Sequence, residues 1–165
     1  MEFSVDSAAL MTSLKRLSSI VTNKPMIPMH EAIKIGSRVG DRVSFFACNP
    51  HMSAQAEVSS ENVCSFEVGV NAEVFTGVVA VLPKDTKTVF TMDPADRRTL
   101  VVTAGKASFR LNLLAEDVFS PAKNYEEMPF IPMDVRQFID NLKRVSFCRN
   151  SKSDREIFSA VCVNT

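Results

Sequence analysis

Residues 130–146 read FIPMDVRQFIDNLKRVS, and they repeat the pattern of residues 2–18, which read EFSVDSAALMTSLKRLS. Over the thirteen positions that begin at Asp6 and at Asp134, five residues are identical at an offset of 128. In both stretches a short opening segment leads to an aspartate that can cap a helix, and then to apolar residues at helical spacing. This restart predicts a chain built from repeated strand and helix units.

A weaker copy of the same pattern begins near Val68, at an offset of 65. There Val70-Asn71 aligns with Val5-Asp6, and three apolar residues align with the helical stripe Leu10, Leu14 and Leu17: Phe75, Val79 and Leu82. Valines within residues 72–82 locally favour a strand. The alignment predicts a helix instead, because the repeat places these residues where the first unit has its helix, and local preferences should agree with the overall fold. The unit is then a strand, a helix and several strands, and two units form one domain.

The rest of the first 126 residues alternates between short extended runs and turn residues, which is typical of antiparallel sheets. We expect a strand over 1–6, a helix over 8–21, and a surface connection over 115–129 with a domain boundary near Glu126. The fold class is therefore α+β. The remaining strands are expected over 32–35, 43–48, 53–58, 63–70, 88–92, 99–103 and 106–113.

The composition excludes several classes of protein. Nineteen basic residues balance nineteen acidic ones, so the chain as a whole has no net positive charge that would attract it to nucleic acid or membrane. A hydrophobic content of 45% excludes disorder as the main state, and no apolar run is long enough for a membrane span. Four cysteines without a CxxC pair indicate reduced thiols in a cytosolic protein.

The order and spacing of these elements resemble a known family. The first strand and helix, the turn Lys24-Pro25-Met26-Ile27-Pro28, the strand from Gly105 to Leu111 and the restart at Phe130 are similar to the bacterial sliding clamp, the beta subunit of DNA polymerase III. The resemblance implies the DNA clamp fold, with two helices per domain and three domains per chain. Residues 1–126 would be the first domain, and residues 127–165 the truncated beginning of the second, with its first strand, helix and next strand.

The resemblance also implies a function. Two such chains close head to tail into a ring around duplex DNA, which keeps the replicative polymerase on its template without any chemistry. Implied partners are double-stranded DNA without sequence preference, the polymerase, the clamp loader and a second copy; a membrane and a cofactor are not implied. The expected location is the cytoplasm, at the nucleoid. The alternative is a clamp-derived protein-interaction module that does not encircle DNA.

Candidate DNA contacts are basic residues on polar helix faces and in loops, because attraction to phosphates needs no sequence information. By resemblance, the loop after the first helix and the loop after the second domain's helix touch DNA. The alternative for each charge is an ordinary solvated surface. The candidates are Lys15, Arg16, Lys24, Lys143, Arg144, Arg149 and Lys152.

The family closes its ring through an edge strand of the first domain, and the matching residues here are Lys106, Phe109 and Leu111. An apolar pair on an open edge needs a partner to cover it. The alternative is that both apolar side chains point into the domain's own core. In the clamps the start of the second helix adds basic residues to this interface, whereas Glu73 and Val74 stand there in this chain.

Few residues in the sequence support a catalytic or metal-binding function. Cys48 and His51 could form a nucleophile pair or half of a zinc site, but neither a third group nor a second ligand pair has recognisable spacing. A buried cysteine and a turn histidine explain the pair better. Glu126-Glu127, in a proline-containing linker, is a poor candidate for the carboxylate cluster that a nuclease or polymerase needs.

Overall fold

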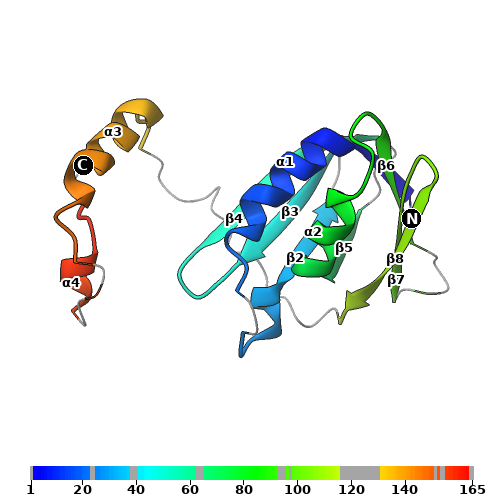
Figure 1. Cartoon of the computed structure of the whole chain (residues 1–165), viewed down its shortest axis with the longest axis horizontal. Helices are drawn as coiled ribbons and strands as arrows, with labels where there is room; N and C mark the ends of the chain where they lie inside the picture. Colours follow the sequence, from blue (N-terminus) through cyan, green and yellow to red (C-terminus); the bar gives the residue numbers. More distant parts are fainter. Residues whose placement is uncertain are drawn as a thin grey trace. The chain divides into compact units, whose positions relative to one another are not determined.

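The computed structural model describes residues 2–22, 25–37, 41–61, 65–92, 96, 98–115, 131–150, 152 and 155–163. The chain divides into two compact units, residues 1–121 and residues 122–165. Each unit is considered by itself below, and Figure 1 shows their elements.

The three predicted helix starts are all formed, and each has the same side-chain cap. Asp6 accepts a hydrogen bond from the backbone N–H of Ala9 at 2.8 Å and begins α1 (Ser7–Ser18). Asn71 accepts one from Val74 at 3.1 Å and begins α2 (Ala72–Ala80). Asp134 begins α3 (Val135–Ser146) in the same way, with the N–H of Gln137 at 2.7 Å. Such a cap satisfies a helix amide that would otherwise be unpaired. The same kind of cap begins all three helices, so the repeat in the sequence is also a repeat of structure.

Helix α2 forms although its valines favour a strand. Phe75 and Val79 of this helix are buried, and so is Leu82, which lies just beyond its C-terminal end. These are the three residues that the alignment predicted for its inner face. Tertiary packing therefore decides its structure against local preference, as expected for a marginal propensity difference.

Eight antiparallel strands form a closed ring in the order β1-β4-β3-β2-β5-β8-β7-β6. The chain enters β2 through a short 3₁₀ turn, η1 (Pro28–Glu31). Within the described residues the predicted mixed fold with antiparallel sheets and two α-helices in the first domain is confirmed. The strands are β1 (Glu2–Asp6), β2 (Ala32–Ser37), β3 (Arg42–Cys48), β4 (Ser53–Glu61), β5 (Phe66–Asn71), β6 (Lys87–Met92), β7 (Thr99–Ala104) and β8 (Ala107–Leu114).

The two repeats exchange their first strands. Strand β1 pairs along its whole length with β6, with Phe3 opposite Phe90, and β5 pairs along its whole length with β2, with Val70 opposite Ile33. The ring thus consists of two four-stranded sheets, β4-β3-β2-β5 and β8-β7-β6-β1. They meet at two narrow junctions, where β1 and β4 share two residue pairs and so do β5 and β8.

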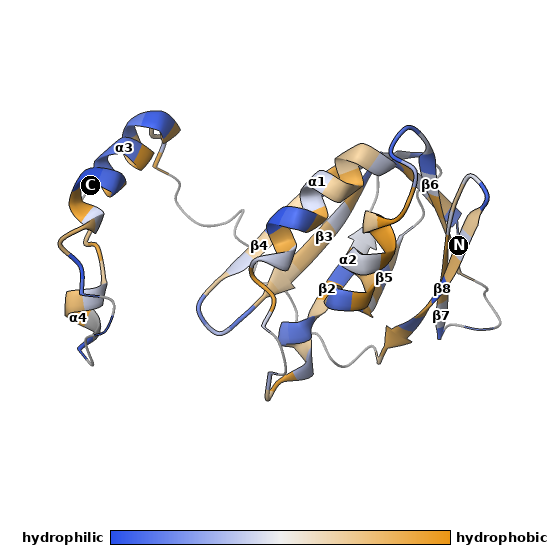
Figure 2. Ribbon diagram, viewed as in Figure 1, coloured by the Kyte–Doolittle hydropathy of each residue, from blue (hydrophilic) through white to orange (hydrophobic). Residues whose placement is uncertain are grey.

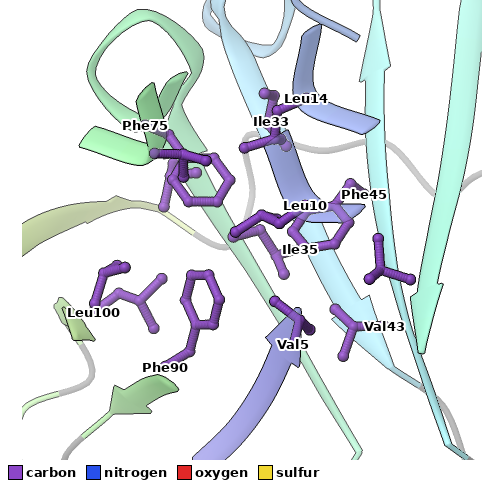
Figure 3. Close-up of a cluster of buried hydrophobic side chains, with 14 of the residues drawn as sticks. Val5, Leu10, Leu14, Ile33, Ile35, Val43, Phe45, Phe75, Phe90 and Leu100 are labelled. Carbon is purple, nitrogen blue, oxygen red and sulfur yellow. The ribbon is translucent and has the colours of Figure 1, made fainter. Parts of the chain in front are cut away.

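The core lies beneath the two helices, which lie side by side over the strands (Figure 1). Side chains from α1, α2 and both sheets converge on it, including Leu10 and Phe75 (Figure 3). Phe3 stacks on Phe90 with ring centroids 4.7 Å apart, and on Phe66 at 4.8 Å. Burial of this apolar surface is the main driving force for folding.

The second unit differs from the sequence-based expectation. Its helix α3 is followed by a short helix, α4 (Glu156–Ser159), and the strands predicted on either side of α3 are wrong for the described residues. A strand needs a paired neighbour to satisfy its backbone groups, and the described part of this unit offers none. No residue of α3 is buried: Phe138 and Leu142 are half-buried, and Ile139 and Val145 are exposed.

Within the described residues no helix is long and apolar enough to cross a membrane.

Candidate nucleic-acid interface

The basic pair of α1 is presented by the same periodicity that builds the core. Leu10, Leu14 and Leu17 are buried, which places Lys15 and Arg16 on the opposite, exposed face in the last turn. Figure 2 shows this as a hydrophilic band near the C-terminal end of the helix. Cations there also interact favourably with the helix dipole, so their position stabilises α1 in addition to making a positive surface.

Helix α2 presents a different surface. It contains no basic residue, and its exposed positions include Glu73, Val74 and, just beyond its end, Val81. The two valines are 54% and 66% exposed. Any attraction to phosphate in this pair of helices therefore comes from α1 alone.

The second unit carries the other predicted contacts. Lys143 and Arg144 are exposed in the last turn of α3, the position that Lys15 and Arg16 hold in α1. Arg149 and Lys152 are exposed in the loop that follows. Lys24 lies outside the described residues.

Two hydrogen bonds involve Asn150, which follows α3. The side chain of Asn150 accepts a hydrogen bond from the backbone N–H of Lys152 at 3.1 Å, and the N–H of Asn150 donates to the carbonyl of Phe158 at 2.7 Å. Arg149 and Lys152, which stand beside these two hydrogen bonds, are exposed.

The three predicted interface residues differ in their burial. Lys106 is exposed in the turn before the strand, Phe109 is half-buried against the core, and Leu111 is 4% exposed within it. For Leu111 the core alternative is therefore the one that the structure supports. Arg110 is exposed on the outward face of the same strand, as strict alternation of inward and outward residues predicts.

Cys48 and His51 have the surroundings of a buried cysteine and a turn histidine. Cys48 is 7% exposed, and burial raises the pKa of its thiol, which disfavours the reactive thiolate. His51 lies exposed in a turn held by Asn49, whose side chain accepts from the N–H groups of His51 and Met52 at 2.8 Å each. Among the described residues no three His, Cys, Asp or Glu side chains are grouped as a metal site would need.

Glu61 and Lys87 form an ion pair at the surface of the first unit. Lys87 Nζ lies 2.6 Å from Glu61 Oε1, and this hydrogen bond and charge lower the pKa of Glu61. The pair links the end of β4 to the start of β6 at the surface, so it belongs to the architecture of the sheets and not to a reactive centre.

Comparison with known proteins identifies the family. A family model described as DNA polymerase III beta subunit, N-terminal domain, matches residues 1–126. The beta sliding clamp of Caulobacter vibrioides (strain NA1000 / CB15N) is 24% identical over 165 residues, covering 100% of this chain and 44% of the relative. This chain therefore spans less than half the length of that relative.

Solved structures show the same fold. The pol III beta structure from Caulobacter crescentus gives a TM-score of 0.80 at 23% identity, covering 94% of this chain and 40% of that one. The DNA polymerase III subunit beta from Pseudomonas aeruginosa gives 0.82 at 18% identity, covering 94% and 41%. Since the family model matches most of the sequence, and the repeated caps and strands agree with it, the chain belongs to the family of the DNA polymerase III beta subunit, N-terminal domain.

Proposed function

We propose that this chain is the N-terminal part of a sliding clamp, with residues 1–126 as its first domain and residues 127–165 as the beginning of its second. The complete protein encircles duplex DNA, tethers the replicative polymerase and performs no catalysis. The observation that carries this proposal is the family match over 1–126. The return of the same cap and the same basic pair in α3 adds to it, because a helix-lined ring needs that element more than once.

The proposed mechanism is weak, sequence-independent attraction. Exposed Lys and Arg side chains in the last turns of α1 and α3 offer charge to phosphates without the shape needed to read bases. Such contacts are screened by salt and are easily exchanged, which allows sliding. The residues assigned to this role are Lys15, Arg16, Lys24, Lys143, Arg144, Arg149 and Lys152.

Ring closure is assigned to the β8 side of the first domain. Lys106 and Phe109 are exposed or half-buried there and can meet a partner, while Leu111 supports the strand from within the core. The partner in the ring is a second copy of the complete protein. Polymerase and clamp loader bind regions that lie mostly outside this chain, and the complex works in the cytoplasm on nucleoid DNA.

The test uses the complete gene product. Its mass by light scattering should be that of a dimer, and it should stay on nicked circular DNA but leave after the circle is linearised. A monomer that is indifferent to DNA ends would refute the ring and favour the protein-interaction module.

A charge variant tests the assigned helix face. Lys15→Glu with Arg16→Glu should shorten retention on circular DNA and reduce the salt dependence of DNA binding by about two phosphate contacts. Lys84→Glu with Arg98→Glu, which reverses two exposed charges outside α1, is the matched control and should retain the wild-type salt dependence. Equal loss in both variants would mean that net charge, and not α1, attracts the DNA.

A further inference from the structure

Two cysteines of the second unit line one hollow of its surface. Cys148 and Cys162 are both free and exposed, whereas Cys48 in the first unit is buried. The hollow has a volume of about 510 Å³, and both exposed cysteines are among the residues that line it. Two accessible thiols in one hollow differ chemically from a single exposed cysteine, because they can form a bond with each other.

A backbone hydrogen bond joins the two segments that carry these thiols. The N–H of Asn150 donates to the carbonyl of Phe158 at 2.7 Å. Asn150 follows Cys148 by two residues, and Phe158 precedes Cys162 by four. A disulfide requires α-carbons within about 7 Å of each other, so it forms only between segments that already lie close together. The hydrogen bond holds the segments after α3 and after α4 in such an arrangement.

The end of α3 places Cys148 on the same side as the second thiol. The N–H of Cys148 donates to the carbonyl of Val145 at 3.0 Å, so the two residues follow each other at the spacing of one helical turn. Val145 and Cys162 line this hollow and also a second one, of about 360 Å³. Cys162 therefore lies where the two hollows meet, on the side of α3 that leads to Cys148.

We propose that Cys148 and Cys162 form a reversible intramolecular disulfide when the chain is exposed to hydrogen peroxide. One thiolate attacks a peroxide oxygen, the O–O bond breaks, and a sulfenic acid forms while the departing hydroxide takes up the proton of the thiol. The second thiolate attacks that sulfur, so the S–S bond forms, the S–O bond breaks and a second water leaves. The two thiols are oxidised by the loss of two hydrogens, and the peroxide is reduced to two waters.

The disulfide changes the segment that lies between the two cysteines. It closes residues 149–161 into a loop, which includes the exposed side chains of Arg149 and Lys152. A closed loop has fewer conformations than an open one. Oxidation therefore limits the positions that these two basic side chains can reach. The disulfide requires no DNA and does not depend on the proposed clamp function.

Peptide mapping of the 165-residue chain after treatment with hydrogen peroxide tests the pairing. At about 10 µM chain, an effective concentration of about 1 mM between the two thiols favours closure within one chain about 100-fold over pairing between chains. We expect a monomer with a mass about 2 Da lower, a crosslinked peptide pair that contains Cys148 and Cys162, and recovery of both thiols with dithiothreitol. Cys48→Ala, which removes a thiol of the first unit, should leave the crosslink in place.

A displaced thiol tests the role of the hollow. Cys162→Ser with Val163→Cys moves the thiol by one residue, to a position that lines the second hollow but not the first. This variant should form the intramolecular crosslink about tenfold more slowly, since disulfide geometry is strict. An unchanged rate, with an unchanged far-ultraviolet circular dichroism spectrum, would overturn the role of the hollow.

The products of the wild-type chain separate this proposal from its competitors. A chain in which peroxide leaves Cys148 and Cys162 as free thiols would overturn it. So would a disulfide that joins two chains or pairs either residue with another cysteine. Oxidation of Cys148 to a sulfinic acid while Cys162 stays reduced would also overturn it, because the second thiol would then not reach the first.

Discussion

Replacing Phe75 by alanine should destabilise the first domain more than any change on the exposed side of the same helix. Phe75 is fully buried, and its ring centroid lies 6.3 Å from that of Phe45 in β3 and 6.1 Å from that of Phe90 in β6. The side chain therefore joins α2 to both sheets (Figure 3). Its removal leaves a cavity at the point where the three layers meet.

The magnitude follows from that position. A buried Phe→Ala change costs about 3–5 kcal/mol through lost burial and the residual cavity. Alanine is the better helix former, which offsets about 0.5 kcal/mol. The expected loss is about 3.5 kcal/mol, which is a large part of the roughly 5–15 kcal/mol that a domain has in total. At a denaturant slope of about 2 kcal/mol per molar urea, the unfolding midpoint should fall by about 2 M.

Urea unfolding followed by far-ultraviolet circular dichroism measures this difference. The control is Val74→Ala, one residue earlier on the exposed side of α2, which should change stability by less than about 0.5 kcal/mol. If Val74→Ala cost more than Phe75→Ala, the face of α2 that carries Phe75 would not be the buried one. The alignment of α2 with α1 would then be wrong.

Three further predictions concern single groups. Asn71→Ala should cost about 1 kcal/mol in the same urea assay, because the cap of α2 is lost, and an unchanged midpoint would contradict that role. Burial and the raised pKa of Cys48 predict that iodoacetamide alkylates it about tenfold more slowly than the exposed Cys148, as peptide mass mapping can measure. Lys87→Ala should raise the pKa of Glu61 in an NMR titration; the pair's contribution to stability is present above the ordinary carboxyl pKa and is lost as pH falls through the lowered one. A Glu61 titration that is identical in both proteins would show that Lys87 does not set it.

The order of elements in the first domain could be predicted because its signals are local and repeated. Asp6 and Asn71 cap their helices as expected, and the apolar spacing after each cap predicts the buried face. The alignment with α1 predicted a helix for α2, where its valines alone would have indicated a strand. The ring of strands and the exchange of β1 and β5 could not be predicted, since strand pairing depends on contacts between residues distant in the sequence.

The candidate site could be predicted only in part. Exposure of Lys15, Arg16, Lys143 and Arg144 follows from helical periodicity, but exposure does not reveal what binds there. On β8 the spacing of Phe109 and Leu111 was compatible with either face of the strand, and only the pairing with β7 shows which one they share. The strands expected around α3 failed because a strand is defined by its neighbours and not by its own residues.

The exchange of first strands has a consequence for synthesis on the ribosome. Strand β1 is made before each of its partners, its principal partner is β6, and Phe3 must wait for Phe90 to be translated. Until then the N-terminal segment can find only its short junction with β4. A nascent chain that carries the first repeat alone is therefore an unfinished sheet, and it acquires protection from proteases only when most of the second repeat has left the exit tunnel.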